Sequence, residues 1–101
     1  MTREDLNRRL RAEAIVTLEP EEWEDLAGSF EEVERHPTLI AGDLLIARDE
    51  TGLVAVEQPS PSERVIRRLD GEEAAQLFVK DRLDTYERMW DGCGCKVEYY
   101  R

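Results

Sequence analysis

DLLIARDETGLVAVEQP, residues 43–59, is the stretch that decides the fold. Two apolar runs, 44–47 and 53–56, lie on either side of the turn sequence DETG at 49–52. Short apolar runs around a turn with glycine at its end are typical of a β-hairpin. The first run contains three large apolar residues in succession, so we expect that strand to be covered on both faces of the sheet.

Two further strands are predicted, one on each side of a long helix. Residues 64–70, RVIRRLD, follow the Pro/Ser connection at 59–63 and complete a three-stranded meander. Residues 96–100, KVEYY, alternate apolar and polar side chains as a closing strand does. Between them, residues 70–92 combine apolar side chains at helical spacing with capping residues at both ends, which predicts a helix.

Helices are also predicted in the first third of the chain. Residues 2–13 begin with a capping-box pair, Thr2 and Asp5, and carry a narrow apolar stripe. Residues 14–18, AIVTL, fit either a short strand or the trailing end of that helix. Residues 20–37 predict a second helix, with a proline and acidic residues in its first turn and a break near its internal glycine as an alternative.

Taken together, these elements predict an α+β fold in the order ααβββαβ. The expected architecture is a small antiparallel sheet, a three-stranded meander plus a C-terminal strand, packed by helices. At 101 residues the chain can bury one core without disulfides or a metal, so we expect a single domain, 1–101.

The charge balance restricts the partners. The chain has 24 acidic and 14 basic residues and a formal net charge of −10. A field of this sign repels the phosphates of nucleic acids and of anionic membranes, and attracts basic proteins and cations. No apolar run approaches the ~20 residues of a membrane span, and the first residues do not resemble a signal peptide. With two cysteines, this composition predicts a cytoplasmic protein that binds neither nucleic acid nor membrane.

One charged residue lies where the third helix is expected to be apolar. At ~100° per residue, Arg82 falls near the middle of the arc that carries Phe78, Tyr86 and Trp90. Its stem can lie along the aromatic rings while its guanidinium reaches water. Alternatively, Arg82 forms a buried ion pair with a carboxylate, inside the fold or across a dimer contact, or it contacts an anionic ligand.

The most distinctive chemical feature of the sequence is a pair of cysteines, Cys93 and Cys95, separated by one glycine. They can be small apolar residues at a tight turn, or two thiolate ligands of a zinc or iron–sulfur site, which a symmetric dimer would have to complete. They can also form a strained, easily reduced disulfide. A catalytic thiolate is the weakest interpretation, because the pair follows a helix C-terminus in an acidic chain.

The sequence contains no phosphate-binding glycine loop, nucleophile elbow or histidine-rich metal motif, and this favours a role other than catalysis. Four aromatic residues near the C-terminus, Tyr86, Trp90, Tyr99 and Tyr100, can line a pocket or an interface. We therefore predict a protein-interaction or regulatory module that binds another protein or itself, with a homodimer as one form. The alternative is a small metal-binding or thiol-redox protein that uses the cysteine pair.

Overall fold

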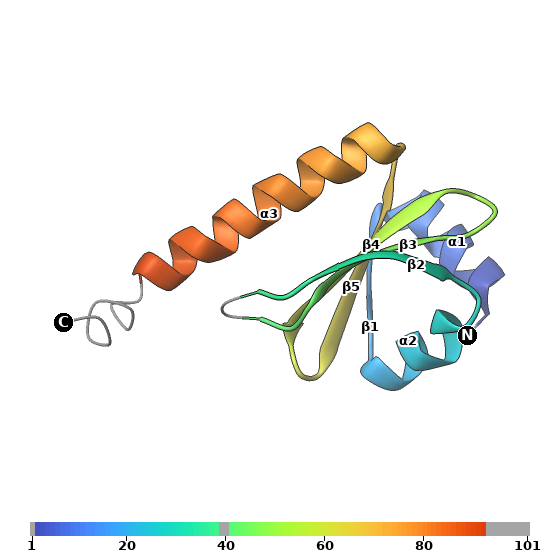
Figure 1. The fold of residues 1–101 in the computed structure, drawn as a ribbon. Coiled ribbons are helices and arrows are strands. Elements are labelled where there is room, and N and C mark those ends of the chain that lie inside the picture. Colours follow the sequence, from blue (N-terminus) through green and yellow to red (C-terminus); the bar gives the residue numbers. More distant parts are fainter. Residues whose placement is uncertain (1, 39–40, 93–101) are drawn as a thin grey trace.

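The computed structural model describes residues 2–38 and 41–92, and within them the chain forms three helices and five strands (Figure 1). In chain order these are α1 (Arg3–Glu13), β1 (Ile15–Leu18), α2 (Pro20–Ala27), β2 (Glu31–His36), β3 (Leu44–Arg48), β4 (Leu53–Ser60), β5 (Glu63–Leu69) and α3 (Glu72–Gly92). The predicted α+β class is confirmed.

All five strands belong to one antiparallel sheet with the spatial order β1-β5-β4-β3-β2. The predicted meander is its centre, formed by β3, β4 and β5. In the predicted turn, the backbone N–H of Asp49 donates to the carbonyl of Gly52 at 3.0 Å. Gly52 has a φ of 143°, a conformation that glycine adopts without steric cost. The hairpin is therefore where the sequence placed it.

The single helix predicted within residues 20–37 is wrong, and the predicted alternative, a break near Gly28, is confirmed. α2 ends at Ala27, and the chain then pairs with β3 as the edge strand β2. Val33, which fits the helical spacing, instead lies where the register between β2 and β3 shifts, and it is 42% exposed. The change follows Gly28, a poor helix former, and the ladder with β3 satisfies backbone groups that a longer helix would have satisfied.

The predicted element order also needs correction. Residues 15–18 form a strand that pairs with β5, so they are not the end of α1. Ala14 takes a φ of 62°, which ends the helix and turns the chain into β1. The described residues follow the order αβαββββα rather than ααβββαβ. The strand predicted at 96–100 lies outside the described residues.

Helices cover both faces of the sheet. α1 and α2 pack on one face and α3 packs on the other, as Figure 1 shows. Successive residues of β3 alternate between the two cores: Leu45 belongs to the first core, while Leu44 and Ile46 belong to the second. The expectation that this strand is covered on both faces is confirmed.

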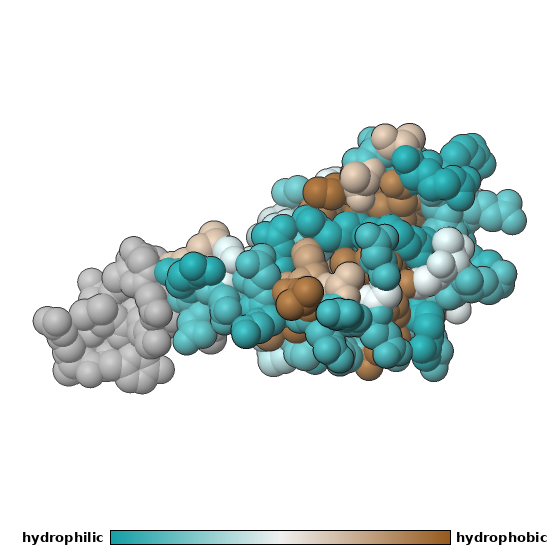
Figure 2. All heavy atoms as spheres, turned by 90° about the horizontal axis from the view of Figure 1, so that it is seen from above, coloured by the Kyte–Doolittle hydropathy of each residue, from teal (hydrophilic) through white to brown (hydrophobic). Residues whose placement is uncertain are grey.

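Helix α3 is longer than the sheet that supports it. Its 21 residues span about 31 Å at 1.5 Å per residue. Its N-terminal part crosses the sheet, and its C-terminal part extends beyond the body of the molecule (Figure 1). The view from above shows a mostly hydrophilic surface with small, separate hydrophobic patches (Figure 2). The N-terminal half of α3, with Ala75, Val79 and Leu83, therefore makes its apolar contacts with the sheet.

Replacing Gly42 by alanine is expected to lower the free energy of unfolding by about 1–3 kcal/mol, because the new methyl group would be overpacked. A Cβ at this position would lie 2.7 Å from Cβ of Gln58, which cannot move without its strand. Gly28 is the matched control: its surroundings are open and its φ is −65°, so alanine there is neutral or stabilising by up to about 1 kcal/mol. Urea unfolding of both variants checks this, and equal effects would contradict it.

Candidate functional site

Helix α3 meets the sheet through a cluster of charged and aromatic side chains, which we call the Glu57 cluster. Its members are Glu57 of β4, Arg67 of β5, and Phe78, Arg82 and Tyr86 of α3. The three helical members are spaced four apart, so they lie along one face of α3. Alternation along β4 and β5 turns the two strand residues toward that same face.

Glu57 is the acceptor at the centre of this cluster, with a side chain only 8% exposed. The hydroxyl of Tyr86 donates to its Oε2 at 2.7 Å, and Nη2 of Arg67 donates to its Oε1 at 3.5 Å. Nε of Arg82 lies 3.4 Å from Oε2. The structure therefore places Arg82 beside a buried carboxylate of its own fold, although its own side chain remains 30% exposed.

The two guanidinium groups also share an aromatic neighbour. Their central carbons lie 4.9 Å (Arg67) and 5.3 Å (Arg82) from the centre of the Phe78 ring, within the range of a cation–π interaction. Nε of each arginine is enclosed and has no hydrogen-bond partner. An unpartnered buried donor costs about 1–3 kcal/mol, so the cluster has a shortage of acceptors.

Tyr86 acts as a hydrogen-bond donor in this setting. Burial, and then the hydrogen bond to Glu57, raise the pKa of Tyr86 to about 12, although Arg82 and Arg67 oppose the shift. The phenol therefore stays protonated near neutral pH and is unsuited to act as a base. The arrangement can hold α3 against β4 and β5.

Tyr86 is expected to make stability depend on pH in the alkaline range. Because its folded pKa is raised above the ordinary value of about 10, its contribution is complete below pH ~10 and is lost as the pH rises toward ~12. Phenolate absorbance at 295 nm, compared between the parent and Tyr86→Phe, isolates this titration. A difference signal centred near pH 10 would contradict the proposed environment.

A second cluster lies on the opposite face of the sheet, where α1 meets the β3–β4 turn. We call it the Asp49 cluster; it consists of Asp49, Arg68, Asn7 and Arg3. The Asp49 side chain is fully buried and lies 3.1 Å from Nη1 of Arg68 and 3.4 Å from Nδ2 of Asn7. Arg68 also donates to Oδ1 of Asn7, and Nε of Arg3 lies 4.0 Å from Asp49.

The carboxylate of Asp49 also organises its own turn. It accepts hydrogen bonds from the backbone N–H groups of Thr51 at 2.9 Å and Gly52 at 3.0 Å. Burial acts to raise the pKa of Asp49, but hydrogen bonds from Arg68 and Asn7 and the charge of Arg68 outweigh it and lower the pKa. Asp49 is therefore a structural anion that joins the hairpin to α1 and β5.

The structure describes only some of the residues that were predicted to form a site. Cys93, Cys95, Tyr99 and Tyr100 lie outside the described residues, so their roles in metal binding, redox chemistry or an interface remain predictions. Trp90 lies within α3. Among the described ranges, 2–38 and 41–92, no group of three or more His, Cys, Asp or Glu side chains is arranged to hold a metal ion.

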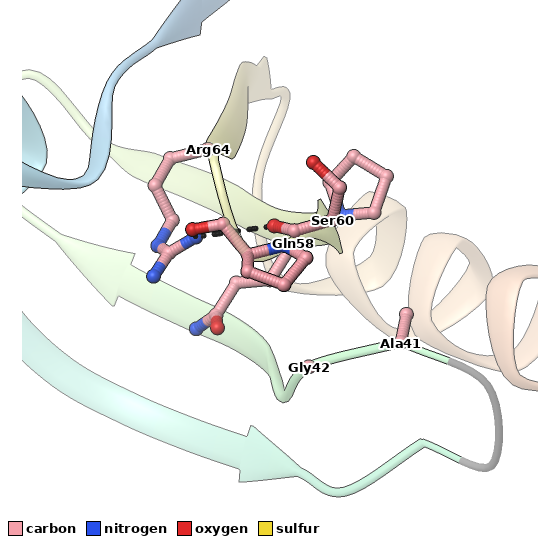
Figure 3. Close-up of a pocket in the computed structure, with 7 residues that line it drawn as sticks. Ala41, Gly42, Gln58, Ser60 and Arg64 are labelled. Atoms are coloured by element: carbon pink, nitrogen blue, oxygen red, sulfur yellow. Dashed lines mark hydrogen bonds between the residues drawn. The ribbon is translucent and has the colours of Figure 1, made fainter.

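An open hollow of about 540 Å³ lies at the end of the β4–β5 hairpin (Figure 3). Its lining includes Arg64, Gln58, Ala41 and Gly42, and the backbone N–H of Gly42 donates to the carbonyl of Gln58 at 3.0 Å. The guanidinium of Arg64 donates to the carbonyl of Glu63 at 2.9 Å and to two more carbonyls at 3.4 Å. All three contacts come from Nη1, which holds one end of the Arg64 guanidinium against the hairpin.

Strand β2 forms an exposed, acidic edge of the sheet. It reads EEVERH, and every residue except His36 is exposed. The stretch 19–36, which contains α2 and β2, holds eight of the 24 acidic residues and one of the 14 basic residues. Beside β2 lies a second hollow of about 230 Å³, bounded by Val33, Ile46 and Ala75, among others. This edge was not identified from the sequence, because its residues had been assigned to a helix.

None of the described helices combines the length and apolar character needed to cross a membrane. Comparison with protein-family models, curated proteins and solved structures found no significant match.

Proposed function

We propose that this chain is a non-catalytic protein-interaction domain that binds a basic, extended segment of another protein along β2. The observation that carries this proposal is an outer strand with five exposed residues, whose only strand partner in the described part of the chain is β3. An edge strand presents unpaired backbone N–H and C=O groups, and an extended peptide can pair with them as an additional strand.

Charge specifies the kind of partner. Glu31, Glu32 and Glu34 lie on β2 itself, and most of the net negative charge of the chain comes from residues 19–36. Such a surface attracts lysine- and arginine-rich segments and speeds their association, while it repels acidic ones. The same charge disfavours pairing between the β2 edges of two copies. A different, basic protein is therefore the better occupant of this edge, and a homodimer through another surface remains a prediction.

The register shift in β2 gives both faces of an added strand an acidic neighbour. Glu32 pairs with Ala47 and Glu34 pairs with Ile46, whose side chains lie on opposite faces of the sheet. Directly opposite residues in antiparallel strands are about 5 Å apart, so basic side chains on either face of the peptide can reach a carboxylate, where they would compete with Arg48 for Glu31 and with Arg35 for Glu32. The hollow beside Val33, whose lining is part apolar and part charged, offers space for a side chain of the same segment.

Fluorescence anisotropy with a labelled peptide of alternating lysine and threonine tests the proposal. The triple variant Glu31→Gln, Glu32→Gln, Glu34→Gln is expected to bind about tenfold more weakly, since each exposed charge pair is worth up to about 1 kcal/mol. The matched control removes three charges from α3: Glu73→Gln, Asp81→Asn and Glu87→Gln. Equal losses in both variants would show that only net charge matters and would contradict a site at β2.

A second peptide separates backbone pairing from charge attraction. N-methylation of alternate residues removes the donors along one edge of the peptide without changing its charge, so binding should be lost when that edge faces β2. Unchanged binding of peptides methylated along either edge would exclude strand addition. We further propose a cytosolic location, which rests on the low cysteine content.

A further inference from the structure

The Glu57 cluster holds more hydrogen-bond donors than its own acceptor can use. Each guanidinium carries five N–H donors. Within the described residues, Arg67 donates only to Glu57, at the long distance of 3.5 Å, while Arg82 approaches that carboxylate without a hydrogen bond. The shortest contact to Glu57 comes from Tyr86 at 2.7 Å. Tyr86 therefore supplies the main hydrogen bond to the carboxylate, and most N–H groups of the two arginines have no acceptor in the cluster.

The same cluster has an excess of positive charge. Two guanidinium groups approach a single carboxylate, and Tyr86 is neutral near pH 7. The local charge is therefore opposite in sign to the net charge of the chain, which is −10. Apart from the long contact of Arg67 Nη2, the Nη groups of both arginines make no hydrogen bond within the described residues, and the charge there favours an anion as their acceptor.

The two arginines are also pre-positioned. Both guanidinium groups lie near the Phe78 ring, which restricts their motion. Arg67 approaches Oε1 of Glu57, and Arg82 approaches Oε2. Their side chains are 24% and 30% exposed, so the outer N–H groups can reach a ligand from solvent. Planar guanidinium groups bind the oxygen atoms of carboxylates and phosphates through paired hydrogen bonds.

We propose that Arg67 and Arg82 together bind one oxyanion group, a carboxylate or a phosphate, at the solvent side of the Glu57 cluster. Glu57 positions the two arginines and limits the strength of binding through its own negative charge, and Phe78 supports them from the side. This site lies on the α3 face of the sheet, and it does not depend on the proposed interaction at β2.

Arginine Nε–Hε signals in nitrogen-15 NMR spectra report on the site directly. The protein is titrated with potassium phosphate and, separately, with potassium acetate, with potassium chloride keeping the ionic strength constant. We expect saturable shifts of the Arg67 and Arg82 signals at millimolar ligand and none for Arg88, an exposed arginine of the same helix. A stronger response to phosphate would identify a phosphoryl ligand, and a stronger response to acetate would identify a carboxylate. No saturable shift in either titration would overturn the proposal.

Three variants make the test specific. Arg82→Met should abolish saturable binding and Arg88→Met should preserve it. Glu57→Gln removes the competing charge and should tighten anion binding about threefold to tenfold. If Arg82→Met does not fold, Arg82→Lys, which keeps the charge but loses the planar donor pair, should weaken binding. Binding that survives the replacement of Arg82, or that weakens in Glu57→Gln, would assign the anion to another place and overturn the proposal.

Discussion

Asp49→Ala is expected to lower the free energy of unfolding by about 3–5 kcal/mol, the largest effect of any single substitution considered for this chain. The substitution removes the partner of Arg68, whose side chain is only 22% exposed, and leaves that charge without compensation. It also frees the turn N–H groups of Thr51 and Gly52 and the amide of Asn7. A buried carboxylate with this many donors cannot be replaced by solvent without opening the structure.

Urea unfolding followed by circular dichroism measures this loss. Glu50→Ala is the matched control: its carboxylate is one residue away and contacts Arg3 at 3.2 Å, but it is 85% exposed, so its loss should cost less than about 1 kcal/mol. Because the pKa of Asp49 is lowered by folding, its contribution is complete above pH ~4 and is lost as the pH falls further. Similar effects of the two substitutions would show that Asp49 is not the anchor described above.

Glu57→Ala is expected to lower the free energy of unfolding by about 2–3 kcal/mol, the second largest effect. It leaves the Tyr86 hydroxyl and two guanidinium groups without their shared acceptor. The expected loss is smaller than at Asp49, because both arginines are partly exposed and can regain water. Glu57→Ala should also release α3 from the sheet before the rest of the domain unfolds.

A double-mutant cycle with Tyr86→Phe separates these contributions. A coupling of about 1–2 kcal/mol between Glu57→Ala and Tyr86→Phe is expected, since a hydrogen bond to a charged acceptor is stronger than a neutral one. Glu63→Ala, an exposed position at the start of β5, provides the control. Additive effects of the Glu57 and Tyr86 substitutions would contradict the 2.7 Å hydrogen bond as the main contact.

The central part of the fold could be predicted because its signals are local. A turn that needs glycine at Gly52, between two apolar runs, leaves few alternatives to the β3–β4 hairpin. Strand β2 could not be predicted in this way. Trp23, Leu26 and Val33 fit one helical face, and only pairing with β3 decides that the last of them belongs to a strand. Tertiary pairing overrides local periodicity when a segment is short and mostly charged.

Only part of the Glu57 cluster could be predicted from the sequence. Arg82 interrupts an apolar helical face, and Glu57 continues the face of β4 that carries Leu53 and Ala55. Two charges of opposite sign on two apolar faces indicate a pair, but the sequence does not show that these faces meet. The Asp49 cluster was not visible at all, because its partners come from α1 and β5 and are ordinary polar residues in the sequence.

The carboxylates of β2 also oppose self-association of the protein. An unpaired outer strand invites other copies to add to it without limit, which is the first step toward fibrils. At neutral pH, mutual repulsion between these acidic strands prevents that growth. Replacing these glutamates by glutamine removes that repulsion, so the triple variant should associate edge to edge more readily than the parent protein.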